Sequence, residues 1–433
     1  MKALVLTAGR GVRLRPLTST RSKSMLMVAG RPVLDYIFES LRENDIRDVV
    51  LVVGHGREQI LDYLRDKEES EFHVRYVLQH EQKGVEHAIL TARSEIEDQD
   101  EFLLVNGDVL VEPEMVRRTV QHHAIAGSEM TMLVTLVSNP GQFGAVRMNR
   151  DGFVEELVEK APPNTYVSNY VVAGVSVFRR EILDLLEKHH TMERTLGTLI
   201  ESGGKVAATV WEQEWTEFTW PWDVLRANKV ALDKMLSGRG SFIAESADIR
   251  SNVVIEGSVY IGEDSIVRSG TTLRGPVYIG RGVHVGSNSL VRDYACLCDG
   301  VTLGYSVEVR NSVIYERVRI GRMTYVADSI IGADSCIEAG VQMWNWRPGD
   351  QKLYINEDDG PVEVPLSKFG AMVGDGVIIG VNSSLYPAIR IGERSIISPG
   401  CVIDRDIPPG SDVSVKQELL IRSRDGLSRH GCG

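Results

Sequence analysis

The second half of the sequence places an aliphatic residue at every sixth position, and this period constrains the fold more than any other feature. Twelve consecutive matches run through this region: Ile243, Ile249, Ile255, Ile261, Val267, Leu273, Ile279, Val285, Val291, Leu297, Leu303 and Val309. An α-helix repeats every 3.6 residues and cannot keep a period of six on one face. Stacked coils of short strands can, because each aliphatic side chain packs inward on the one a coil away. The pattern predicts a parallel β-helix.

Interruptions of the repeat set the limits of this domain. The phase slips near Tyr315 and once more further on, and a non-repeating loop spans 344–370. The ladder then resumes with matches at Val373, Ile379, Leu385, Ile391, Ile397 and Ile403. We expect the β-helix at 243–410, with the loop as an insertion, followed by a tail at 411–433. Its last residues, 423–433, are expected to be disordered.

The segment 1–236 instead alternates short apolar runs with helical patterns. Such alternation is typical of βαβ units on a largely parallel sheet. The expected strands are 3–6, 49–53, 74–78 and 102–105, and the expected helices are 32–44, 58–65 and 85–93. We therefore predict an α/β, Rossmann-like domain at 1–236, joined to the β-helix by a flexible linker at 237–242.

Composition and charge argue against several classes of protein. The net charge is −12, whereas nucleic-acid binders usually present a basic face. The sequence has no apolar run near the ~18 residues that a membrane helix needs, and its start lacks the features of a signal peptide. The five cysteines form no C-x-x-C pair, and their odd number fits buried free thiols in a reducing compartment. We expect a cytoplasmic protein that binds neither nucleic acid nor a membrane.

Two polar features directly follow predicted strands. The loop Gly9–Arg13 comes after the first strand, and Asp108 comes after the strand at 102–105. Glycines let backbone N–H groups approach an anion, and an arginine adds donors for phosphate oxygens. Because ligands of open α/β sheets bind outside the carboxyl ends of the strands, both features predict a phosphate site there. The glycine spacing does not match the dinucleotide fingerprint, and the sequence has no Walker motif.

The stretch from 6 to 41, LTAGRGVRLRPLTSTRSKSMLMVAGRPVLDYIFESL, resembles the signature of the sugar-1-phosphate nucleotidylyltransferases. The resemblance implies that a glycine-rich loop, an arginine and a lysine hold a nucleoside triphosphate. Here the matching positions are Leu6, Ala8, Gly9, Gly11, Arg13 and Lys23. Val12 replaces the usual Thr, and Ser22 stands where a Pro normally precedes the lysine. Neither change removes a charge, so we expect an altered rate or substrate range rather than loss of activity.

The resemblance continues through the whole first half. It implies base recognition by Gln79 and Gly84, Mg²⁺ binding by Asp108 and Asp223, sugar binding by Gly144, Glu159 and Asn169, and sugar-phosphate binding by Lys160. In this family the sugar phosphate attacks the α-phosphorus and pyrophosphate leaves, so the protein supplies position and charge. Two carboxylates suit a hard cation, and the catalytic cations Arg13, Lys23 and Lys160 would offset phosphate charge. The expected substrates are UTP or dTTP with N-acetylglucosamine-1-phosphate or glucose-1-phosphate.

The second half resembles the left-handed β-helix of archaeal-type bifunctional enzymes that also acetylate glucosamine-1-phosphate. In that family a His three residues before a Tyr is the general base, whereas here Arg322 precedes Tyr325. An arginine stays protonated and cannot accept the proton. We therefore expect acetyl transfer to be lost or strongly reduced, leaving a vestigial site at Arg322, Tyr325, Asn345 and Lys368 in a domain that forms a homotrimer. Acetyl-CoA would be a cofactor only if this domain is active.

Two alternatives stay open. A bifunctional enzyme would still acetylate glucosamine-1-phosphate and release CoA. A catalytically silent regulatory subunit would use the same two domains to bind a nucleotide-sugar or a partner protein. Such a subunit has no reason to keep all five charged residues Arg13, Lys23, Asp108, Lys160 and Asp223, so the enzyme is the favoured interpretation.

Overall fold

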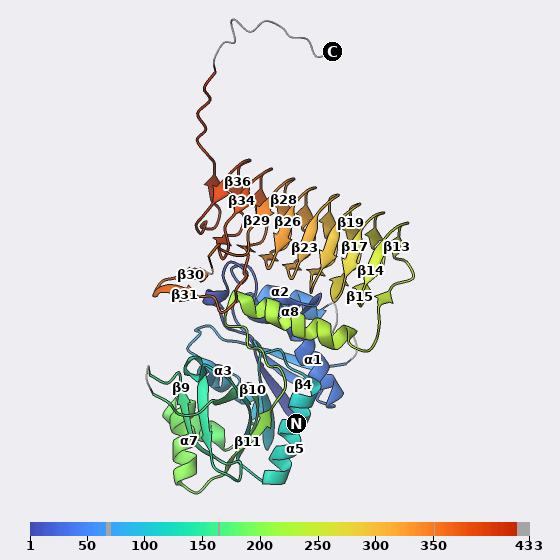
Figure 1. The fold of residues 1–433 in the computed structure, drawn as a ribbon. Coiled ribbons are helices and arrows are strands. Elements are labelled where there is room, and N and C mark those ends of the chain that lie inside the picture. Colours follow the sequence, from blue (N-terminus) through green and yellow to red (C-terminus); the bar gives the residue numbers. More distant parts are fainter. Residues whose placement is uncertain (66–70, 163–164, 350, 422–433) are drawn as a thin grey trace, which may run out of the picture.

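The computed structural model describes residues 1–65, 71–162, 165–349 and 351–421. Within them the chain forms an α/β domain and a β-helix that lies along one side of it (Figure 1), which confirms the predicted fold class. The segment 423–433, for which disorder was expected, lies outside the described residues. Among the described helices, none combines the length and the apolar composition of a membrane span.

The first domain is built on a mixed sheet with strand order β11-β7-β10-β6-β1-β4-β5. The strands are β1 (Lys2–Leu6), β4 (Asp48–Val53), β5 (His73–Leu78), β6 (Glu101–Asn106), β7 (Met130–Leu136), β10 (Tyr170–Arg179) and β11 (Val206–Trp211). Strand β10 runs antiparallel to β6 and β7, and the other pairs along this path are parallel. The expected strands are confirmed, and β1 lies inside the sheet because its side chains are apolar on both faces.

Helices cover both faces of this sheet. Helices α1 (Val33–Glu43), α2 (Arg57–Arg65) and α5 (Pro113–Ala126) pack on one face, and α3 (Val85–Thr91), α6 (Ile182–His189) and α7 (Met192–Glu201) pack on the other. The helix expected at 85–93 ends at Thr91, because Ala92 leaves helical geometry (φ −92°, ψ 4°) before α4 (Arg93–Ile96). The domain closes with α8 (Pro221–Leu236).

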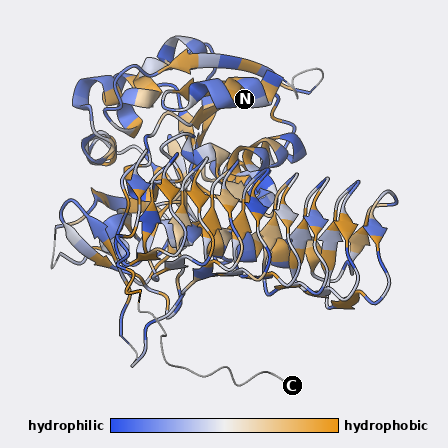
Figure 2. Ribbon diagram, turned by 90° about the horizontal axis from the view of Figure 1, so that it is seen from above, coloured by the Kyte–Doolittle hydropathy of each residue, from blue (hydrophilic) through white to orange (hydrophobic). Residues whose placement is uncertain are grey.

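The β-helix has three parallel sheets, and each coil adds one short strand to each sheet. The sheets run from β12 (Phe242–Ile243) to β35 (Arg390–Ile391), from β13 (Asp248–Ile249) to β38 (Asp412–Val413), and from β14 (Val254–Glu256) to β37 (Val402–Ile403). Ile243 pairs with Ile261 and Ile261 with Ile279, so one regular coil corresponds to three hexapeptides. The strands appear mostly orange in Figure 2, as expected from their aliphatic composition.

The two phase slips are corners shortened by one residue. Leu297 pairs with Ile314 and Ile314 with Ile331, so each of these coils is one residue shorter than the regular coil. The tightened corners contain Asn311 and Asp328, whose φ angles are 40° and 49°. The Asn311 amide also donates to the Asp328 carboxylate at 2.6 Å. Short polar side chains tolerate this left-handed backbone better than other residues do.

The expected insertion contains structure of its own. Strands β30 (Tyr354–Glu357) and β31 (Gly360–Glu363) form an antiparallel hairpin within it. At the ends of the domain, β12 begins at Phe242, the last residue of the expected linker, and β38 ends at Val413, beyond the expected limit at 410.

The two domains share a hydrophobic core. It joins Leu14, Leu26, Val28, Trp222 and Leu232 of the first domain to Cys296, Cys298, Val313, Tyr315, Ile330 and Phe369 of the β-helix. At Gly30 (φ 76°) a Cβ would lie 2.1 Å from the Tyr278 ring, so the close approach of the domains requires glycine there. Cys296, Cys298 and Cys401 are buried free thiols, as expected, and Cys336 is part-exposed.

Candidate active site

The loop after β1 carries the residues predicted to bind the triphosphate. It leaves Leu6, passes the buried Ala8, turns at Gly11 (φ 58°), and continues through the 3-10 turns η1 (Val12–Leu14) and η2 (Lys23–Met25). At Gly11 a Cβ would lie 2.8 Å from Cγ of Lys23, so glycine lets this lysine pass. At Gly9 a Cβ would meet no described atom within 4 Å. This leaves room beside the backbone for a ligand.

The two departures from the family signature leave this loop intact. The Ser22 hydroxyl donates to the carbonyl of Thr7 at 3.2 Å and accepts from the Ser24 N–H at 3.3 Å. It therefore caps η2 and ties the loop to the end of β1. Val12 is exposed.

Two charged groups from separate motifs meet at the edge of the sheet. Nζ of Lys23 lies 2.7 Å from Oδ2 of Asp108, which follows β6. Burial opposes the charge of the lysine, but Asp108 together with Glu217 outweighs burial and raises the pKa of Lys23 above its ordinary value. A fixed cation and a carboxylate thus lie together beside the glycine loop, where phosphates and a metal ion could bind.

Glu217, which the sequence analysis missed, lies in the same cluster. Its backbone forms a bridge with Val109, next to Asp108. Burial, and then the charge of Asp108, raise the pKa of Glu217 to about 8, while Lys23 lowers it. A carboxyl group whose ionisation is disfavoured by a neighbouring carboxylate is suited to sharing a cation with that neighbour. The sequence signal was a second carboxyl residue six positions before Asp223, but only the fold brings it to Asp108.

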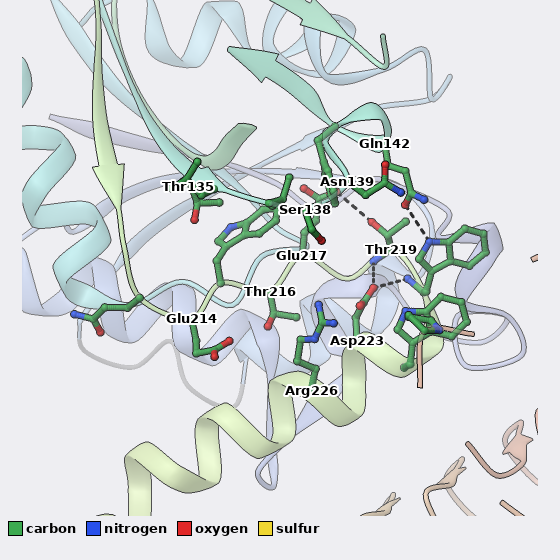
Figure 3. A pocket seen from close by; sticks show the side chains of 18 of the residues that line it. Thr135, Ser138, Asn139, Gln142, Glu214, Thr216, Glu217, Thr219, Asp223 and Arg226 are labelled. Atoms are coloured by element: carbon green, nitrogen blue, oxygen red, sulfur yellow. Dashed lines mark hydrogen bonds between the residues drawn. The ribbon is translucent and has the colours of Figure 1, made fainter. Parts of the chain in front are cut away.

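Asp223 has a structural task in this protein. Its Oδ2 accepts from the backbone N–H groups of Trp220 at 2.7 Å and Thr219 at 3.1 Å, and so caps the start of α8 (Figure 3). Burial raises the pKa of Asp223 to about 6, although these two hydrogen bonds lower it. Metal binding by Asp223 remains a prediction.

A cavity of about 560 Å³ adjoins the cluster (Figure 3). Its wall combines the end of β7 and the loop after it, the segment 212–220, the first turns of α8 and residues that follow or end β31. The lining side chains include Glu217, Trp220 and Asp223 of the first domain, and Val362, Glu363 and Pro365 of the insertion. The insertion of the β-helix therefore contributes to a cavity of the first domain.

The predicted base-recognition residues also come together. The Gln79 amide donates to the carbonyl of Gly84 at 3.2 Å, and the same nitrogen lies 2.9 Å from Nδ1 of His87. Gly84, with φ 102°, precedes α3.

The Arg13 guanidinium, predicted to bind phosphate, is exposed and lies 5.1 Å from the centre of the Trp220 ring.

Gly144 and Glu159, two of the three predicted sugar-binding residues, lie on one hairpin. Gly144 and Glu159 pair across β8 (Gly144–Met148) and β9 (Val154–Glu159), and a Cβ at Gly144 would lie 2.6 Å from the Glu159 carboxylate. Lys160 directly follows β9 with φ 46°, and its backbone N–H donates to the carbonyl of Phe143 at 3.1 Å. Asn169 is exposed and immediately precedes β10.

The residues of the expected vestigial acetyltransferase site lie in adjoining coils of the β-helix, where Tyr325 pairs with Gln342 and the Phe369 N–H donates to the Asn345 carbonyl at 2.7 Å. Arg322 is exposed in the turn before β26 (Tyr325–Ala327), 5.9 Å from the centre of the Tyr305 ring. Asn345 is buried, and its amide donates at 2.5 Å to Asp328, which follows β26. Arg322 and Asn345 therefore lie at opposite ends of this strand. Lys368 is exposed, next to the buried Phe369.

The carboxylates of the cluster fit a nucleotide-bound magnesium ion. Within the described ranges, no group of three or more His, Cys, Asp or Glu side chains is arranged to hold a metal alone. A Mg²⁺ ion that bridges phosphates needs only one or two protein carboxylates, since phosphate oxygens and water fill its other positions. Asp108 with Glu217 meets this requirement.

Comparison with known proteins gives the family. Residues 2–221 match the model described as Nucleotidyl transferase. In the second domain, 273–347 match the GMPPB C-terminal domain, and 370–405 match the bacterial transferase hexapeptide of six repeats. The chain is 36% identical over 432 residues to the Bifunctional protein GlmU of Methanococcus maripaludis strain S2, covering 98% of this chain and 100% of that protein. This chain belongs to the sugar-1-phosphate nucleotidyltransferase family.

Further members of this family match over nearly their whole length. The Bifunctional protein GlmU of Methanocaldococcus jannaschii is 35% identical over 428 residues, covering 98% of this chain and 99% of that protein. The Bifunctional sugar-1-phosphate nucleotidylyltransferase/acetyltransferase of Sulfurisphaera tokodaii is 32% identical over 420 residues, covering 95% and 99%. The predicted enzyme class, a nucleotidyltransferase of the sugar-1-phosphate type, is confirmed.

Proposed function

We propose that this protein joins a pyrimidine nucleoside triphosphate, UTP or dTTP, to N-acetylglucosamine-1-phosphate and releases pyrophosphate. Glucose-1-phosphate is the second candidate sugar phosphate. The observation that carries the proposal is the cluster of Lys23, Asp108 and Glu217 beside the open backbone of Gly9. The pyrimidine is proposed from the positions of Gln79 and Gly84.

The chain's own residues then have distinct tasks in an in-line displacement. Arg13 and Lys23 bind the triphosphate and offset the charge that builds on its oxygens. Lys160 binds the phosphate of the sugar, while Gly144, Glu159 and Asn169 hold its ring. This arrangement brings the attacking oxygen to the α-phosphorus without any covalent step on the protein.

We assign the metal to Asp108 with Glu217 rather than to Asp108 with Asp223. One carboxylate oxygen of Asp223 already accepts two backbone hydrogen bonds, whereas the Glu217 carboxylate accepts, among the described residues, only the longer bond from Oγ1 of Thr219 at 3.3 Å. Burial and then the charge of Asp108 disfavour ionised Glu217, and a cation between the two carboxylates would offset this effect. When bound, Mg²⁺ would neutralise phosphate charge and orient the leaving pyrophosphate.

We further propose that the β-helix has lost acetyl transfer and trimerises the protein. Arg322 cannot serve as a base, and the Asn345 amide is engaged with Asp328. Several apolar side chains remain exposed on this domain in the single chain, among them Tyr305, Met323, Trp344, Trp346, Ile378, Ile396 and Val402. Sedimentation equilibrium tests the trimer. Release of CoA from acetyl-CoA with glucosamine-1-phosphate would instead support the bifunctional alternative.

The proposed function is tested by pyrophosphate release with Mg²⁺ over a grid of four nucleoside triphosphates and several sugar-1-phosphates. Release should be confined to the pyrimidine triphosphates and a few sugar phosphates. The absence of release from a folded protein in every combination would favour the regulatory alternative.

A further inference from the structure

The carboxylate of Asp375 links the β-helix to the triphosphate-binding loop. Asp375 lies in the turn between β32 (Met372–Val373) and β33 (Ile378–Ile379). Its oxygens accept from Oγ1 of Thr20 at 2.5 Å and from Nη2 of Arg21 at 2.8 Å, and Oδ1 also accepts from the Ala333 N–H at 2.8 Å. One side chain of the second domain thus holds residues two and three positions before Lys23.

Arg21 is built into the domain interface rather than exposed at it. The residue is only 6% exposed, and its guanidinium carbon lies 4.5 Å from the centre of the Tyr315 ring. Burial opposes its charge, but Asp375 together with Tyr315 and Glu316 outweighs burial and keeps the pKa of Arg21 raised. Both carboxylates that pair with it in the described structure, Asp375 and the more distant Glu316 at 4.0 Å, come from the β-helix.

Tyr315 fixes the chain on the other side of Lys23. Its ring is fully buried, and its hydroxyl accepts from the backbone N–H of Met27 at 3.2 Å. The β-helix therefore holds the chain both before and after Lys23. A buried arginine that loses its carboxylate partner is strongly disfavoured, so loss of Asp375 should displace this stretch rather than leave it in place.

A second contact reaches the other end of the loop. Nη2 of Arg390, in β35, donates to the backbone carbonyl of Arg13 at 3.2 Å. The same guanidinium donates to the carbonyl of Asn356 at 2.9 Å and pairs with Glu357 at 2.5 Å, both in the insertion hairpin. Arg390 thus connects the hairpin beside the cavity to the residue that is proposed to bind phosphate.

We propose that Asp375 and Arg390 are positioning residues for nucleotidyl transfer, holding Arg13 and Lys23 where they meet the triphosphate. The inference rests on the proposed function and adds a role to the β-helix, which becomes part of the catalytic unit in addition to a scaffold. Neither residue touches substrate. Their effect passes through the backbone between residues 13 and 23, at a site where small displacements have large kinetic consequences.

The test compares full-length Asp375→Asn with the wild-type protein. We expect kcat/KM for the nucleoside triphosphate to fall about ten- to thirtyfold and KM for the sugar phosphate to stay within about twofold, because the described parts of β8 and β9 do not contact Asp375. Asp375→Glu, which keeps the charge, should recover part of the loss. Asp404→Asn is the matched control, since it removes a two-bond pair with exposed Arg405 of the same domain and should leave both constants unchanged.

Hydrogen–deuterium exchange provides a readout that does not depend on activity. In Asp375→Asn, peptides covering 12–26 should exchange at least fivefold faster, while those covering β10 and α7 keep their wild-type rates. Wild-type kinetics and wild-type exchange at 12–26 would overturn the inference, and so would equal acceleration over the whole first domain. If the wild-type protein releases no pyrophosphate, the proposed function is contradicted. The exchange comparison would still decide whether Asp375 orders residues 12–26.

Discussion

Nζ of Lys23 and Oδ2 of Asp108 lie 2.7 Å apart although 85 residues separate them in the sequence. The contact forms because β1 and β6 are neighbouring parallel strands whose carboxyl ends meet at one edge. Asp108 thus contacts Lys23, which is proposed to bind phosphate. Asp108 is also proposed to bind the metal ion. Replacement of Asp108 should therefore weaken both the placement of Lys23 and the binding of the metal ion.

Asp108→Asn should lower kcat by at least about 10²-fold, the scale on which removing one charge-stabilising group acts in a preorganised site. The dependence on Mg²⁺ concentration should shift to higher concentration at the same time. Asp45→Asn, at a side chain that is 96% exposed, is the control and should match the wild type. Steady-state pyrophosphate release over a Mg²⁺ titration measures both quantities, and an unchanged titration curve would contradict the assignment of Asp108.

Glu217→Gln and Asp223→Asn should have different effects. The first removes a proposed metal ligand, so kcat should fall by about 10²-fold or more while the protein stays folded. The second weakens the cap of α8, so the free energy of unfolding should fall by about 1 kcal/mol with a smaller effect on kcat. Urea unfolding and kinetics on both variants separate the two roles. A larger fall in kcat for Asp223→Asn than for Glu217→Gln would instead support Asp223 as the metal ligand.

The stability of the metal-free protein should depend on the ionisation of Glu217. The pKa of Glu217 rises from an ordinary value of 4.5 to about 8 in the folded protein. Between these values the folded state holds a proton that the unfolded state has lost, so the free energy of unfolding falls as pH rises. The pKa of Asp223 is raised to about 6, so its ionisation also lowers the free energy of unfolding as pH rises, over a lower pH range. We expect the free energy of unfolding, measured with urea in EDTA from pH 5 to 8.5, to decline less steeply with pH in Glu217→Gln than in the wild type. Equal slopes in the two proteins would contradict this role of Glu217.

Two glycines of the loop should respond differently to alanine. Gly11→Ala places a side chain at φ 58° and 2.8 Å from Lys23, so it should cost about 1–2 kcal/mol of stability and lower kcat. Gly9→Ala meets no described protein atom within 4 Å, so it should leave stability unchanged and raise KM for the triphosphate. Thermal unfolding and kinetics on the pair check this. Loss of stability in Gly9→Ala would show that the loop, rather than a ligand, needs that space.

The period-six ladder and the βαβ alternation made the two-domain fold predictable, because each depends on local patterns that repeat along the chain. Lys23 was predicted from the family resemblance, and Asp108 also from its place after a predicted strand, but neither signal marks Glu217. The only sequence signal of Glu217, its place six positions before Asp223, does not distinguish it from Glu212 and Glu214 nearby. Its proposed role depends on a bridge to Val109, which lies far earlier in the sequence. The sequence pattern also located the slip near Tyr315, although only the strand pairing in the structure shows that the coil is shortened by one residue.

The domain interface could not be predicted from sequence periodicity. Arg21 and Asp375 are 354 residues apart, and neither departs from the pattern expected of an ordinary surface residue. Their pairing follows from how the β-helix packs along the first domain. The hairpin in the insertion was missed for a related reason, because two strands of four residues are too short to establish a period.

The central claim is nucleotidyl transfer to a sugar phosphate, and mass spectrometry of the products tests it most directly. Wild-type protein, Mg²⁺, UTP and N-acetylglucosamine-1-phosphate should yield the UDP-sugar and pyrophosphate in equal amounts, and Glu217→Gln should form both at least about 10²-fold more slowly. If a dTDP-sugar or a glucose nucleotide forms faster, the reaction stands and the substrate assignment changes. Absence of any nucleotide-sugar with every pyrimidine triphosphate and sugar phosphate would contradict the account.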